Sequence, residues 1–146
     1  MSAVTVNEFS TVRGPSAASR VGYAVAILVN TGLLYAADNI LRWNVPFITG
    51  DWVDILWAVR LSLVAGIMAN AMYIVYDADW FRHLTGIVTG ALALLSMAVT
   101  YTVFPFHLPS EFIAEVMRLG MLAAMLGLTI AIIAGLVHLL LGQREA

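Results

Sequence analysis

The sequence predicts an all-α integral membrane protein, an up-down bundle of four transmembrane helices with both termini in the cytoplasm. Of its 146 residues, 62% are hydrophobic and only 11% are charged, whereas a soluble domain of this size carries roughly 25% charged residues. Four stretches exceed the about 20 apolar residues that cross a bilayer. The connections between them are short, so consecutive helices are expected to lie antiparallel and side by side.

The four predicted spans divide the chain into one helical domain between two tails. The spans cover about residues 21–41, 52–76, 80–104 and 112–141. They lie in a domain over residues 19–142, preceded by a polar tail at 1–18 and followed by a short tail at 143–146. None of them shows the strict alternation of apolar and polar residues that a membrane β-barrel needs. Asp51 and Ser110 precede the second and fourth spans, where their side chains are expected to cap the helices.

The arginines predict the orientation of these spans. With the N-terminus inside, the cytoplasmic segments carry four of them, Arg13, Arg20, Arg82 and Arg144. The outer loops then carry Arg42 alone. Because positive residues concentrate on the cytoplasmic side, this asymmetry predicts both termini inside a bacterial cytoplasmic membrane.

Small residues at four-residue spacing recur on three of the spans, where they predict close helix packing. Water is absent between helices in a membrane, so association depends on close approach and on interhelical hydrogen bonds. The candidate packing residues are Ser62, Gly66 and Asn70, then Gly86 and Gly90, then Gly127, Ala131 and Gly135. These faces either pack the helices of one chain or form an interface between protomers.

Two arginines lie within the spans, where an ionisable residue indicates a functional site or a buried partner. Arg60 and Arg118 lie roughly 12 Å and 9 Å from the starts of their spans, by the helical rise per residue. Carboxylates occur at similar depths, which predicts an outer polar cluster of Asp38, Asp54, Arg60, Glu115 and Arg118. This cluster is either a structural ion-pair network or a binding site for a polar head group, an anion or a proton.

His83 and His138 are expected near the cytoplasmic ends of the third and fourth spans. They are the only candidates we identify for a metal or haem, and they form only a weak pattern because neither belongs to a metal-binding motif. The chain has no cysteine, so Cys-ligated metals and thiol chemistry are excluded. A formal charge of −2 from so few groups does not indicate a nucleic-acid partner. We therefore expect no cofactor.

Several stretches resemble those of a known group of proteins. They read VPFIT at 45–49, SLVAGIMAN at 62–70, YIVYD at 73–77, WFR at 80–82 and VFPF at 103–106. They are similar to stretches in an uncharacterised family of short four-span integral membrane proteins of actinobacterial type, and the likeness extends from about residue 20 to residue 141. The resemblance implies the four-span architecture and brings no activity, cofactor or site.

No phosphate-binding loop, nucleophile elbow or zinc-protease motif occurs, so the sequence does not indicate an enzyme. The function expected first is a structural or accessory membrane subunit, associated with lipid and either with further copies of itself or with a larger complex. The alternative is a small transporter, channel or lipid-binding module that uses the outer polar cluster.

Overall fold

The chain folds into four α-helices, each long and apolar enough to cross a membrane. The computed structural model describes residues 16–76 and 78–142. The helices are α1 (Ala17–Asn39), α2 (Trp52–Val75), α3 (Asp79–Val103) and α4 (Glu111–Gly142). Their bounds lie within four residues of the predicted spans. The predicted tails, apart from residues 16–18, lie outside the described part of the chain.

The helix starts differ from expectation in two places. Helix α1 begins earlier than predicted, because the Ser16 hydroxyl accepts a hydrogen bond from the Ser19 backbone N–H at 3.1 Å and caps it. Asp51 does not form the expected cap on α2, since its own backbone is already in the helical region. Its carboxylate instead accepts a hydrogen bond from the Thr49 hydroxyl at 3.2 Å.

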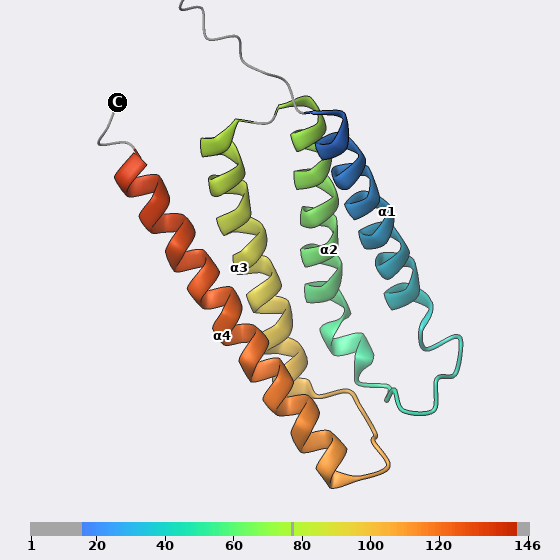
Figure 1. The fold of residues 1–146 in the computed structure, drawn as a ribbon. Coiled ribbons are helices and arrows are strands. Elements are labelled where there is room, and N and C mark those ends of the chain that lie inside the picture. The colour runs from blue at the N-terminus through green and yellow to red at the C-terminus, as the bar shows by residue number, and fades with distance from the viewer. Residues whose placement is uncertain (1–15, 77, 143–146) are drawn as a thin grey trace, which may run out of the picture.

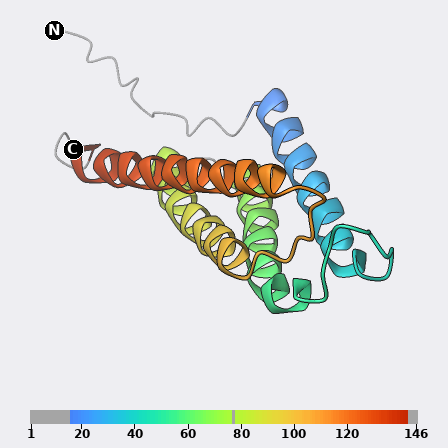
Figure 2. The ribbon, with the colours of Figure 1, turned by 90° about the horizontal axis from the view of Figure 1, so that it is seen from below.

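Consecutive helices run antiparallel in the order α1, α2, α3, α4 (Figure 1). Each helix packs on its neighbour in the chain, but among the described residues α1 and α4 make no contact. The helices therefore form an open row instead of a closed bundle. Seen from below, the row is curved, with α1 and α4 on the same side of α2 and α3 (Figure 2).

The two longer connections lie at one end of the helices, opposite the start of α1 and the end of α4. The loop end holds the connections at residues 40–51 and 104–110, which pair through their backbones. Thr49 donates its N–H to the Pro105 carbonyl at 3.0 Å, and His107 donates to the Phe47 carbonyl at 2.9 Å. The opposite end, which we call the termini end, holds the starts of α1 and α3 and the ends of α2 and α4. Backbone pairing of the loops ties the two helical hairpins together at the loop end.

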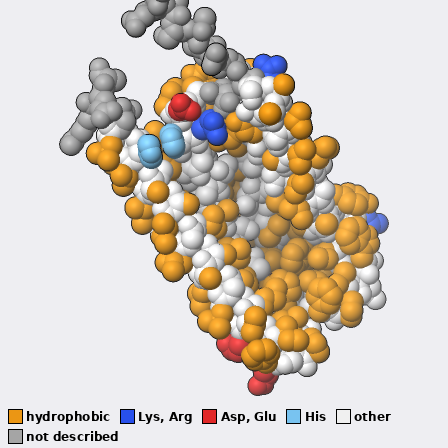
Figure 3. All heavy atoms as spheres, in the orientation of Figure 1, with side chains coloured by type: hydrophobic (Ala, Val, Ile, Leu, Met, Phe, Trp, Pro, Cys, Tyr) orange, Lys and Arg blue, Asp and Glu red, His pale blue; other side chains and the backbone are white. Residues whose placement is uncertain are grey.

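Few side chains are buried inside the chain. Among the described residues, the buried apolar side chains within the helices are Ala37, Ile55, Ala58, Ala69 and Met121. Large apolar side chains cover the outside of the helices instead, as the space-filling view shows (Figure 3). Soluble monomers rarely expose apolar surface of this extent, whereas helices that face lipid tails do. The distribution fits a multi-pass membrane protein.

Candidate functional site

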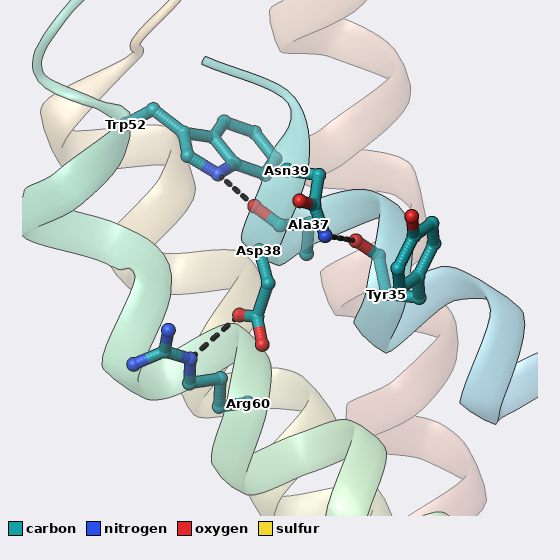
Figure 4. A network of polar contacts seen from close by, with 6 residues as sticks. All are labelled: Tyr35, Ala37, Asp38, Asn39, Trp52 and Arg60. Atoms are coloured by element: carbon teal, nitrogen blue, oxygen red, sulfur yellow. Dashed lines mark hydrogen bonds and ion pairs between the residues drawn. The ribbon is translucent and has the colours of Figure 1, made fainter. Parts of the chain in front are cut away.

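The structure forms part of the predicted outer polar cluster at the loop end. Arg60 Nε donates to Asp38 Oδ1 at 2.7 Å and joins α2 to α1 (Figure 4). The Trp52 indole N–H donates to the Ala37 carbonyl at 2.9 Å, one residue away on α1 (Figure 4). Both contacts hold the first helical hairpin together. The two charged side chains remain 52% and 37% exposed.

The other three residues of the predicted cluster do not join this pair. The Arg118 guanidinium lies over the Phe104 ring, 4.4 Å from its centroid, in a cation–π contact. Asp54 and Glu115 are exposed, and within residues 16–76 and 78–142 neither forms an ion pair with an arginine. Glu115 and Arg118 are kept away from Asp38 and Arg60 because, among the described residues, α4 packs on α3 and does not contact α1 or α2. The cluster therefore does not assemble as one network.

The predicted packing glycines fall into two groups. A Cβ added at Gly66 would lie 3.1 Å from Asn30 Nδ2 on α1, so α1 and α2 approach closely there. Gly90 and Gly135 would meet Ile132 and Ile87 at 3.2 Å, so α3 and α4 interlock reciprocally. These three glycines pack helices within the chain.

Gly86 and Gly127 have open space where a Cβ would stand, with nothing within 4 Å. Asn70 donates to the Gly66 carbonyl at 2.7 Å, a bond within its own helix. Ser62 and Ala131 line a groove, together with Gly86. The small residues therefore fall into two kinds. Gly66, Gly90 and Gly135 allow helices to pack closely, whereas Gly86 has open space beside it and lines the groove.

This groove crosses all four helices and has a volume of about 490 Å³. Helix α3 supplies half of its lining residues, α4 and α2 supply most of the others, and Asn30 is its lining residue from α1. Its exposed lining surface is mainly apolar, and its polar residues are Asn30, Ser62, Thr89, Arg82 and His83. Figure 3 shows this face hollowed between α4 and α2. A volume of this size lies in the range of about 300–1,000 Å³ that is typical of ligand sites.

A second cavity, of about 390 Å³, lies at the termini end. Its lining residues are Tyr23, Tyr73, Asp79, Arg82 and His83. The last two also line the groove, so the polar cavity and the apolar groove share a wall. Figure 3 shows histidine, acidic and basic side chains gathered at this end of the hollow. Together the two cavities form an apolar groove along the helices with a polar mouth.

Aromatic and polar contacts order this mouth. The rings of Tyr23 on α1 and Tyr73 on α2 lie 5.4 Å apart between centroids. The Tyr73 hydroxyl donates to the Arg82 carbonyl at 3.4 Å, which links α2 to the first turn of α3. Residues from α1, α2 and α3 therefore meet in one place.

The weak metal candidates, His83 and His138, stack on each other across α3 and α4, with centroids 5.1 Å apart and planes 8° apart. An imidazole nitrogen holds a metal close to the plane of its own ring. Two nearly parallel stacked rings share no such point, so as they lie these histidines do not converge on one ion. Elsewhere in the described ranges, no group of three His, Asp or Glu side chains converges as a metal site.

The sequence predicted several residues that line the groove, but it did not predict the groove itself. Ser62, Gly66, Gly86, Gly90, Ala131 and Gly135 were expected to pack helices, and all of them line the groove. His83 was correctly expected at the start of the third span. Predicting the groove would have required knowing that α1 and α4 do not contact each other, and no local sequence pattern indicates this. The signal that could have indicated an opening was the number of small residues. Three helices carry more of them than close packing between successive helices requires.

Comparison with protein-family models, with curated proteins and with solved structures gives no match to this chain. The resemblance to a four-span membrane family therefore stays a prediction, and the functional argument depends on the geometry of the groove.

Proposed function

We propose that the protein is a non-enzymatic, multi-pass membrane protein that binds a lipid-like amphiphile in the groove between α1 and α4. One observation carries this proposal: the open row leaves an apolar groove of about 490 Å³ that ends in a polar mouth. An apolar cleft with a few polar groups at one end is the usual form of a site for a small molecule. Acyl chains would lie along the small-residue floor, with the head group at the termini end.

The proposal moves lipid binding away from the loop end. The alternative drawn from the sequence placed a binding module at the outer polar cluster, but Arg60 there pairs with Asp38 and the cluster does not assemble. The groove opens instead toward the end that the arginine distribution predicts to be cytoplasmic. Membrane proteins commonly bind lipid head groups in basic pockets between helices on that side. The proposed location is a bacterial cytoplasmic membrane.

A second function, an accessory or oligomeric subunit, is favoured by a different observation. On α4, Gly120 and Gly127 lie seven residues apart on one helix face, and both have open space where a Cβ would stand. Small residues that pack against nothing within the chain suit the close approach of a helix from another chain. The two functions are compatible, because this glycine pair does not line the groove. A transport path would also need further chains, since an open row encloses no lumen.

The test is to purify the protein in mild detergent and to measure its mass and its retained phospholipid by native mass spectrometry. We expect bound phospholipid on the wild type. Gly86→Leu should lower retention about tenfold, because a side chain that competes for ligand volume costs about 1–3 kcal/mol. Gly32→Leu is the matched control, since Gly32 also has open space but does not line the groove.

Three outcomes bear on the two functions. Wild type without retained lipid, or equal loss of lipid in both variants, would contradict the groove as a lipid site. A mass that corresponds to a dimer or higher oligomer would support the second function. A strictly monomeric mass without a co-purifying protein would rule the second function out.

A further inference from the structure

The polar mouth of the groove presents its groups in a definite order. Arg82 and His83 line both cavities, so they lie where the apolar groove passes into the polar cavity. Asp79, Tyr23 and Tyr73 line the polar cavity alone. A ligand that enters from the groove therefore meets cationic or hydrogen-bonding groups first, and a carboxylate with two phenol rings beyond them.

The junction of the two cavities suits a phosphate. A guanidinium has five N–H donors in a planar fork, so Arg82 can bind a phosphate while it keeps other contacts. His83 adds a ring nitrogen, whereas His138 stacks on it from α4 and lines neither cavity. Both junction residues also lie within about one turn of the start of α3, where the helix dipole favours negative charge. The junction thus combines several independent features that favour negative charge.

The outer part of the mouth suits an ammonium group. Asp79 supplies a negative charge at the start of α3. The rings of Tyr23 and Tyr73, with centroids 5.4 Å apart and planes tilted by 51°, supply the electron-rich surface that attracts a cation. A simple anionic head group would find only the junction favourable and would leave this carboxylate facing it. The charge order along the mouth therefore matches a zwitterion.

From this order we infer that the site selects a zwitterionic phospholipid of the phosphatidylethanolamine type. Its acyl chains lie in the groove, its phosphodiester contacts Arg82 and His83, and its terminal ammonium contacts Asp79 and the two tyrosines. The inference rests on the proposed lipid-binding function and adds the head-group class. It assigns Asp79 the role of distinguishing an ammonium from a neutral or anionic terminus.

The experiment measures competition between two lipids on the full-length protein in detergent. Equal amounts of phosphatidylethanolamine and phosphatidylglycerol are added, and native mass spectrometry gives the ratio bound. We expect the wild type to prefer phosphatidylethanolamine. Asp79→Asn should lower that preference about threefold to fivefold, the effect expected of one partly exposed charge pair. Phosphatidylglycerol binding should not weaken in this variant, because the substitution removes a carboxylate that an anionic lipid does not use.

Two further variants separate charge recognition from general effects. Asp54→Asn is the matched control, since Asp54 is likewise an acidic residue in the first turn of a helix but lies at the loop end. It should leave the ratio unchanged. Arg82→Gln should weaken both lipids about fivefold, because each basic residue at a membrane surface contributes about 1 kcal/mol toward anionic lipid groups.

The outcomes distinguish this inference from the function on which it rests. A wild type that retains both lipids without preference, or an Asp79→Asn variant with an unchanged ratio, would overturn the head-group assignment and leave the groove function standing. A wild type that binds neither lipid would overturn both. Soluble glycerophosphoethanolamine should not displace the lipid, and displacement by it would show that a free head group, not a lipid, is the ligand.

Discussion

Arg60 and Asp38 show how two charges are accommodated on apolar helices that are long enough to cross a membrane. Their side chains meet at 2.7 Å across α1 and α2, although both keep substantial exposed surface. An arginine within a span is costly unless it is paired or reaches the membrane interface. Pairing across two helices therefore stabilises the hairpin and also keeps the guanidinium from facing hydrocarbon alone.

We predict a measurable but modest coupling between these two residues. In a double-mutant cycle with Asp38→Asn and Arg60→Gln, the coupling free energy of unfolding should be about 0.5–1 kcal/mol, as for other polar contacts between membrane helices. Tryptophan fluorescence during unfolding in detergent provides the measurement, because the chain has four tryptophans. Strictly additive single-variant effects would show that the contact does not contribute to stability.

The second helical hairpin is held by shape instead of charge. Gly90 on α3 receives Ile132 of α4, and Gly135 on α4 receives Ile87 of α3, each at 3.2 Å from the position of an added Cβ. Because lipid tails are as apolar as these side chains, close packing supplies the association of the two helices. The reciprocal arrangement fixes the register of α3 against α4, and so the shape of the groove beside them.

We expect this interlock to be sensitive to a single methyl group. Gly90→Ala and Gly135→Ala should each lower the free energy of unfolding by about 1 kcal/mol, because extra volume in a packed contact forces neighbours to shift. Gly32→Ala, where an added Cβ meets nothing within 4 Å, should instead stabilise the helix by about 0.5–1 kcal/mol. Thermal unfolding of the variants in one detergent makes the comparison. Equal destabilisation of all three variants would contradict the assigned contacts.

At the scale of the whole molecule, the open row determines which surfaces are available for binding. The paired loops join the two hairpins at the loop end, whereas α1 and α4 stay separate along the groove. Each edge helix therefore presents one face to its neighbour and leaves the others to lipid or a partner. The polar mouth and the predicted cytoplasmic side lie at the same end of the molecule.

The predicted orientation is testable because the chain contains no cysteine. Single-cysteine variants Gly50→Cys and Ser110→Cys, both in loop-end connections, should react with a membrane-impermeant maleimide in intact cells that have no outer membrane. Ala78→Cys, between α2 and α3, should react only after the cells are made permeable. The reverse pattern would place the polar mouth on the outer side and contradict the arginine-based topology.

Much of the fold was predictable from local pattern. The four helices match the spans expected from apolar length, since backbone hydrogen bonding in a membrane leaves few alternatives to a helix. The close approach at Gly90 was also expected from the spacing of small residues, whereas the cap at Ser16 was not predicted and moves the start of α1 to Ala17. The grouping of Asp38, Asp54, Arg60, Glu115 and Arg118 depended instead on depth alone, and residues at one depth meet only if their helices are neighbours.

The amino-acid sequence by itself determined that this chain is helical, how many apolar helices it has, and that neighbours in the chain run antiparallel. Only the tertiary structure decided that the row stays open, that Arg118 meets Phe104 instead of a carboxylate, and that Arg82 and His83 stand where the groove meets a polar cavity. The physical reason is range. Hydropathy and short loops determine structure within a helix or between successive helices. The groove depends instead on how α1 and α4 lie relative to each other, and two other helices separate them in the chain.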